Sequence, residues 1–213
     1  MVFFTNSFLA MTFKRKHIAL LVCFVVLPSC SYIHTEKTFR TGVDDWQMYG
    51  GGIGRVNVAL NRVRPPLMKL WEYSAGAGFG GYSATIVDST LFVGTLVGEV
   101  HLIDVATGKG IGTTDFGTAV VGTPIVDKEI VYIPLSRDEE SLVAYNVRLA
   151  KNEWQIKLGD IESSPLLFGD RLLVTTLRGR LLCLNKITGE NIWTFEIPST
   201  NRISMIHSSP ACD

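Results

Sequence analysis

The sequence lacks the residue patterns that most catalytic chemistries require. None of its four cysteines is adjacent to another or spaced as CxxC, and no Cys/His cluster has the spacing of a zinc site. The GxSxG, HExxH and P-loop patterns are also missing. His101 and His207 stand alone, without a Ser, Cys or Asp that the sequence places beside them. We therefore expect no catalytic residues and no metal-binding residues.

The sequence also lacks an apolar run long enough to cross a bilayer. The run at 18–27 (IALLVCFVVL) is far shorter than the about 20 residues that a membrane-spanning helix needs. A basic block at 14–17 precedes it, and Pro28 and Ser29 follow it before Cys30. This order of basic, apolar and small residues is typical of an export signal, so residues 1–29 are predicted to be a signal peptide that forms a helix.

Two alternatives stay open at this end of the chain. The apolar run could instead belong to a membrane-spanning anchor or a buried core helix, which we favour less because the run is short and flanked by charge. Met11, which is followed by TFKRKHIALL, opens a more typical signal than Met1 and is a second candidate for the start.

No excess of basic residues marks a nucleic-acid partner. The whole chain has 20 Lys and Arg against 20 Asp and Glu, and three of the basic residues lie in the expected signal peptide. The chain from residue 30 onward is therefore slightly acidic and still long enough for one domain with a substantial core. Of its cysteines, Cys183 and Cys212 could pair in an oxidising compartment, or Cys183 could be a small buried hydrophobic residue.

Helical periodicity is missing after residue 45, and a β-rich repeat takes its place. Each unit starts with two small residues followed by Thr or Pro, at 83–85, 122–124, 163–165 and 208–210. Apolar runs, turns and a second run follow. Two of the units then have a Thr-Gly corner, at 107–108 and 188–189, which the middle unit lacks. Tryptophans recur at 71, 154 and 193, and Gly112 lies near the position where a further one is expected.

Units of about 40 residues with four short strands are typical of β-propeller blades. We predict an all-β fold with about three complete four-stranded blades and the start of a fourth. A closed propeller has about 4–8 blades, so this one is expected to be incomplete, through a premature stop, a split gene or an incomplete sequence. Because a tryptophan recurs in most units, we expect it to pack between adjacent sheets; a platform for a planar cofactor is the alternative.

Two further patterns are interpreted as loops. Residues 76–81 match GxGxxG by letter, but a strand and no helix is predicted to follow, so nucleotide binding is not expected. The charged run 137–140 is interpreted as a solvated turn, with a partner-facing loop as the alternative.

The segment Leu27-Pro28-Ser29-Cys30 resembles the bacterial lipobox. The resemblance implies that Cys30 becomes the first residue and carries a lipid. By similarity to enterobacterial sorting, Ser31, which is not aspartate, implies the outer membrane with the domain facing the periplasm. Residues 30–44 are then a lipidated linker, and residues 45–213 the partial propeller.

From residue 71 onward, the small-residue motif, the Thr-Gly corner and the recurring tryptophan resemble the pyrroloquinoline-quinone-like β-propeller repeat. The lead-in that starts at Asp45-Trp46 is similar too, and in this family such a segment often joins the two ends of the propeller.

The resemblance implies one of two functions. Quinone-dependent dehydrogenases of the family have a vicinal cysteine pair and a calcium site, which this sequence does not show. Lipoproteins of the outer-membrane β-barrel assembly machinery, of the assembly factor B type, need no cofactor and hold partner proteins. We expect a non-catalytic, lipid-anchored scaffold without cofactor that binds envelope proteins; a dehydrogenase fragment and a non-functional truncated product are the alternatives.

Overall fold

The computed structural model describes residues 32–136, 141–198 and 205–213, and its regular structure there is entirely β. The expected signal-peptide helix, its range 1–29 and Cys30 lie outside the described residues. Within those residues, no helix is long and apolar enough to span a membrane.

Twelve strands form three antiparallel sheets of four, in which neighbours in sequence are neighbours in the sheet. Blade 1 contains β1 (Phe79–Val87), β2 (Thr90–Thr95), β3 (Glu99–Asp104) and β4 (Gly110–Asp115). Blade 2 contains β5 (Ile125–Asp127), β6 (Ile130–Pro134), β7 (Leu142–Asn146) and β8 (Lys151–Ile156). Blade 3 contains β9 (Leu166–Phe168), β10 (Arg171–Thr176), β11 (Arg180–Asn185) and β12 (Asn191–Glu196).

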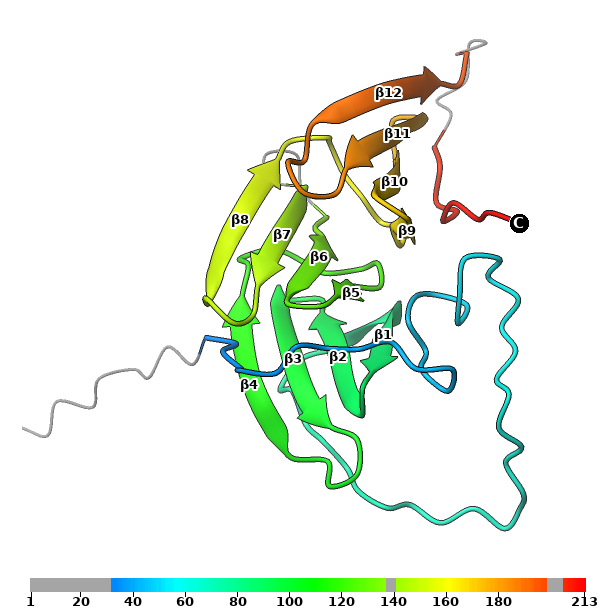
Figure 1. Ribbon diagram of the computed structural model, residues 1–213, viewed down its shortest axis with the longest axis vertical. Helices are drawn as coiled ribbons and strands as arrows, with labels where there is room; N and C mark the ends of the chain where they lie inside the picture. The colour runs from blue at the N-terminus through cyan, green and yellow to red at the C-terminus, as the bar shows by residue number, and fades with distance from the viewer. Residues whose placement is uncertain (1–31, 137–140, 199–204) are drawn as a thin grey trace, which may run out of the picture.

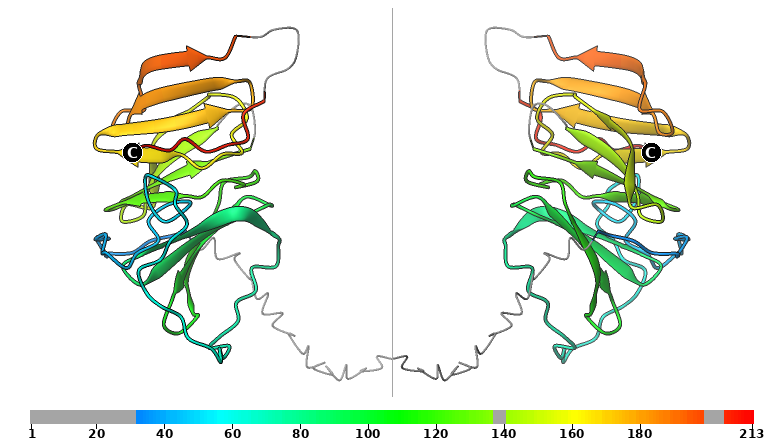
Figure 2. Two further views of the ribbon diagram at one scale, coloured as in Figure 1. Left: turned by 90° about the vertical axis from the view of Figure 1, so that its right-hand side faces the viewer. Right: turned by 90° about the vertical axis from the view of Figure 1, so that its left-hand side faces the viewer.

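The three blades stack face to face along an arc (Figures 1 and 2). One buried cluster fills the space between blades 1 and 2, and a second fills the space between blades 2 and 3. Both faces of the middle sheet are therefore covered, which explains why β7 is buried at Leu142, Val143, Ala144 and Tyr145 instead of alternating with polar residues. The prediction of an all-β fold built from four-stranded blades is confirmed.

The small-residue motifs form a hydrogen-bonded ladder from one blade to the next. The backbone N–H of Thr123 donates to Ser164 Oγ at 2.8 Å, and the N–H of Ser164 donates to Ser209 Oγ at 2.9 Å. These pairs are 41 and 45 residues apart, which are the repeat spacings. Small side chains are needed here because successive backbones approach closely: a β-carbon at Gly122 would lie 2.3 Å from the carbonyl oxygen of Ser163.

On the outer side of the blades, tryptophan side chains bind to the turns that connect the strands. The turn between the last two strands of each blade, at 104–108, 146–150 and 185–189, is here called the corner. Trp154 Nε1 of β8 donates to the carbonyl of Lys186 at 3.1 Å, in the corner of blade 3. Trp71 Nε1 donates in the same way to Val105 in the corner of blade 1, at 2.8 Å. Packing between adjacent sheets is thus confirmed for Trp154, whereas Trp71, which lies before the first strand, packs against blade 1 alone.

The glycine of the Thr-Gly motif is the residue against which the indole rests. Gly108 and Gly189 have φ of +70° and +73°, and a β-carbon would lie 2.5 Å from Trp71 and 2.9 Å from Trp154, respectively. We call the indole-to-carbonyl bond together with this ring-to-glycine contact the tryptophan–corner contact. The third tryptophan, Trp193 in β12, makes no such contact within the described residues and is 43% exposed.

Replacement of the corner glycine tests this contact. We expect Gly108→Ala to lower the free energy of unfolding by about 1–2 kcal/mol for the positive φ, and by about 1–3 kcal/mol more for the collision with Trp71. Urea unfolding of the full chain measures the loss.

The matched control is Gly76→Ala. Gly76 has the same φ of +70°, but a β-carbon there would meet nothing within 4 Å. The control should lose only the about 1–2 kcal/mol of unfolding free energy that the positive φ costs. Equal losses at the two positions would contradict the packing role of Trp71.

Candidate functional site

A cavity of about 620 Å³ lies on the face of blade 1 that is turned away from blade 2. Its walls are rich in aromatic side chains from the lead-in, from the segment before β1 and from β1 itself: Trp46, Tyr49, Trp71, Tyr73, Phe79 and Tyr82. The apolar floor comes from β2 and β3 through Leu91, Val93 and Ile103. Sequence reasoning did not find this cavity, because its walls join segments that are not repeats of one another.

Arg55 holds the lead-in that borders this cavity. Its guanidinium lies 5.3 Å from the ring centre of Tyr49 and donates to the carbonyls of Tyr49, Ser164, Pro165 and Pro210. Burial lowers the pKa of Arg55 to about 10, which still leaves the group charged at neutral pH. The side chain therefore ties the lead-in to the start of blade 3 and to the last small-residue motif.

His101 in β3 has partners that the sequence did not reveal. Its Nδ1 lies 3.0 Å from both Tyr73 Oη and Thr113 Oγ1, and its Nε2 lies 3.2 Å from Glu99 Oε2. The ring is only 5% exposed. A carboxylate, an imidazole and hydroxyls can serve acid–base chemistry, but here the buried imidazole bonds to three partly exposed partners. The cluster joins the segment before β1 to blade 1.

The cysteines of blade 3 and the chain end are separate thiols. Cys183 is buried, Cys212 is partly exposed, and both are free, although they line one cavity of about 420 Å³. Burial raises the pKa of the Cys183 thiol, in agreement with its interpretation as a small hydrophobic residue. Among the described residues, no three His, Cys, Asp or Glu side chains are grouped to hold a metal ion.

The other patterns singled out in the sequence have different outcomes. Residues 76–78 precede β1 as a loop, but residues 79–81 are already part of β1, so the loop interpretation holds only for the first half of this range. A strand and not a helix follows, as expected. The charged run 137–140 and the lipidation residue Cys30 lie outside the described residues, and the expectations for them stay predictions.

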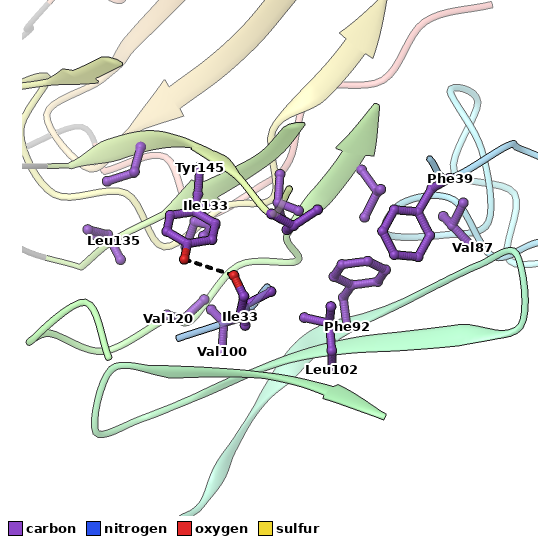
Figure 3. Close-up of a cluster of buried hydrophobic side chains, with 14 residues drawn as sticks. Ile33, Phe39, Val87, Phe92, Val100, Leu102, Val120, Ile133, Leu135 and Tyr145 are labelled. Atoms are coloured by element: carbon purple, nitrogen blue, oxygen red, sulfur yellow. Dashed lines mark hydrogen bonds between the residues drawn. The ribbon is translucent and has the colours of Figure 1, made fainter. Parts of the chain in front are cut away.

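Part of the range expected to be a linker, 30–44, packs inside the fold. Ile33 and Phe39 are 1% and 3% exposed and belong to the cluster between blades 1 and 2 (Figure 3). Phe39 meets Phe92 edge to face at 5.0 Å, and Thr38 Oγ1 donates to Glu129 Oε1 at 2.7 Å. The segment thus contacts both blades. We call residues 32–39 the N-terminal wedge.

The wedge occupies the place of the missing tryptophan. In the corner of blade 2, the carbonyl of Val147 corresponds to those of Val105 and Lys186, but it accepts the backbone N–H of Thr35 at 3.0 Å instead of an indole N–H. At Gly112, where a tryptophan was expected, a β-carbon would lie 3.3 Å from Ile33 Cα.

The corner of blade 2, which lies against the wedge, differs in sequence from the other two corners. The position of the corner glycine is taken by Ala150, which has a φ of +50° and no tryptophan against it. The corner without Thr-Gly and the glycine at 112 therefore both lie against the wedge between the first two blades.

Four-stranded blades, tryptophan–corner contacts and a ladder of small residues define a β-propeller of the pyrroloquinoline-quinone-like repeat class. The family model described as outer membrane protein assembly factor BamB matches residues 68–208. The chain belongs to this family. A curated relative, the outer membrane protein assembly factor BamB of Burkholderia pseudomallei (strain K96243), is 25% identical over 157 residues, which are 70% of this chain.

Solved structures support the fold. Quinohemoprotein alcohol dehydrogenase from Comamonas testosteroni matches with a TM-score of 0.60 and 21% identity over 71% of this chain. A europium-containing methanol dehydrogenase matches with a TM-score of 0.56 and 18% identity over 72% of this chain. At such identities the likeness establishes the fold alone. The chain spans 40% of the curated relative and 27% and 32% of the two dehydrogenase chains.

Loss of Arg55 should loosen the lead-in. We expect Arg55→Ala to lower the free energy of unfolding by on the order of 2–3 kcal/mol, because several buried carbonyls lose a charged donor. Arg55→Lys keeps the charge but not the planar fork that reaches separate carbonyls, so it should recover less than half of the loss. Urea unfolding measures both variants. Full recovery by lysine would contradict the role assigned to the fork.

Proposed function

We propose that this protein is a non-catalytic, lipid-anchored β-propeller scaffold that holds envelope proteins during the assembly of outer-membrane β-barrel proteins. The observation that carries the proposal is the family match over residues 68–208. The relative from Burkholderia pseudomallei, which bears the name of an outer membrane protein assembly factor, supports it. Partners would include components of the β-barrel assembly machinery.

The proposed location is the outer membrane, with the propeller facing the periplasm. It rests on the lipobox-like residues that end at Cys30 and on Ser31 after it. A lipid on Cys30 would keep the propeller at the membrane surface without a membrane-spanning helix. Loops that connect the strands are the favoured contact regions, because a rigid scaffold commonly presents its binding residues on loops.

The structure also bears on the alternative, a fragment of a quinone-dependent dehydrogenase. A quinone would need a planar stacking surface and a calcium site. The indole of Trp154 rests on the corner glycine of blade 3, whereas Trp71 rests on Gly108 and also lines the aromatic cavity. Among the described residues, no three His, Cys, Asp or Glu side chains are grouped to hold a metal ion. The sequence has no vicinal cysteine pair, and the family match is to an assembly factor, so the scaffold is the better-supported function.

Envelope purification tests the scaffold. We expect the tagged full-length chain, cross-linked in cells and purified from solubilised envelope, to recover components of the barrel-assembly machinery. The matched control is Cys30→Ala, which leaves the propeller unchanged but cannot accept the lipid and should recover several-fold less.

Two results would count against the proposal. One is purification from envelope that recovers no barrel-assembly component with either chain. The other is a bound chromophore after incubation of the purified protein with quinone and calcium, which would instead favour the dehydrogenase.

A further inference from the structure

The N-terminal wedge places a firmly held point of the fold very close to Cys30. The backbone N–H of Ile33 donates to Thr114 Oγ1 at 2.7 Å, and its carbonyl accepts from Tyr145 Oη at 3.0 Å (Figure 3). Both bonds are buried, and they tie Ile33 to blade 1 and to blade 2. Ile33 is therefore part of the propeller core and cannot move independently of it.

Few residues separate this point from the proposed lipid. Only Ser31 and Tyr32 lie between Cys30 and Ile33. An extended chain spans about 3.3–3.6 Å per residue, so the Cα atoms of Cys30 and Ile33 can be no more than about 11 Å apart. A flexible linker of the whole range 30–44 would instead let the propeller turn freely above the bilayer.

The surface around this point suits a lipid interface. The wedge begins beside the turn between β7 and β8 (Figure 1). Gly112 lies against Ile33, and Ala150 lines the same hollow as Tyr32. Their chain neighbours Ile111 and Leu149, and Tyr32 itself, are side chains with large apolar parts that are 45%, 57% and 60% exposed. Tyrosine is enriched at the headgroup level of membranes, and aliphatic side chains gain free energy when they leave water.

The charges near this point are largely paired with one another. Arg148 forms an ion pair with Glu36 at 3.3 Å, and Lys151 forms one with Glu153 at 3.4 Å. Asp115 lies near Tyr32, in the walls of the same hollow. The surface therefore has no strong excess of either charge, and the expected contact is a close apolar one and not an attraction between a basic patch and anionic lipid.

We propose that the wedge fixes the orientation of the propeller on the membrane, with the outer edge formed by β4 and the corner of blade 2 against the phospholipid surface. This inference rests on the proposed lipid at Cys30. It goes beyond anchoring, because the same lipid on a flexible linker would give no preferred edge. The inner ladder of small residues and the loops elsewhere on the arc are then turned away from the lipid, toward partners.

Site-specific photo-cross-linking in membranes tests the orientation. A benzophenone amino acid is placed at Leu149 in one full-length variant and at Ile187 in the other. Ile187 is the matched control, since it is an apolar residue in the corner of blade 3 and is even more exposed, at 73%. We expect phospholipid adducts, measured by mass spectrometry, to be several-fold more abundant at 149 than at 187.

A second pair of variants isolates the short tether. Ten Gly and Ser residues inserted between Ser31 and Tyr32 leave the wedge and the propeller unchanged but lengthen the connection to Cys30. The preference for position 149 should then fall to about equal labelling. Equal labelling without the insertion, or a preference that survives it, would overturn the orientation. If the N-terminal peptide carries no lipid mass on Cys30, the proposed anchoring fails and the orientation fails with it, which separates the two outcomes.

Discussion

The contact between one blade and the corner of the next is the interaction on which the rest of this structure depends. A four-stranded sheet has two faces, and neither can be buried within its own repeat. The tryptophan–corner contact solves this on the outer side, because the indole covers apolar surface while its N–H satisfies a corner carbonyl. The ladder of small residues solves it on the inner side, where backbones are close enough for serine and threonine hydroxyls to bridge them.

Between blades 1 and 2 the same requirement is met by different residues. The carbonyl of Val147 still receives an N–H, but from the backbone of Thr35, and the apolar surface is covered by Ile33 and Phe39. The exchange needs room, which Gly112 provides, and it leaves no indole to collide with a side chain in the corner, where Ala150 now lies at a φ of +50°. A stretch near the proposed lipid has thereby become part of the core. This is what would allow the proposed anchor to influence the orientation of the whole propeller.

The blades were predictable because their signals are local. Strand alternation, tight turns and a recurring motif every 39–45 residues are all visible within a short window, and together they specify a four-stranded unit. The wedge was not predictable in this way. Ile33 lies in a polar stretch without periodicity, and its partner Tyr145 is 112 residues away. The signal was nevertheless present as two irregularities, Gly112 in the last strand of blade 1 and the missing Thr-Gly in the corner of blade 2, which the structure shows on either side of the wedge. The partners of His101 were not predictable either. Tyr73 lies 28 residues before it in the sequence and Thr113 lies 12 residues after it, and neither separation is a repeat spacing.

Hydrogen exchange of the N-terminal wedge tests the central claim most directly. If residues 32–39 replace a tryptophan–corner contact, the amides of Ile33 and Thr35, which donate to Thr114 Oγ1 and to the carbonyl of Val147, should exchange as slowly as the strands of blades 1 and 2. Exchange can be followed by mass spectrometry on the full-length protein, with the peptide that covers β3 as the internal standard. Complete exchange of the wedge within seconds, while β3 stays protected, would contradict the account.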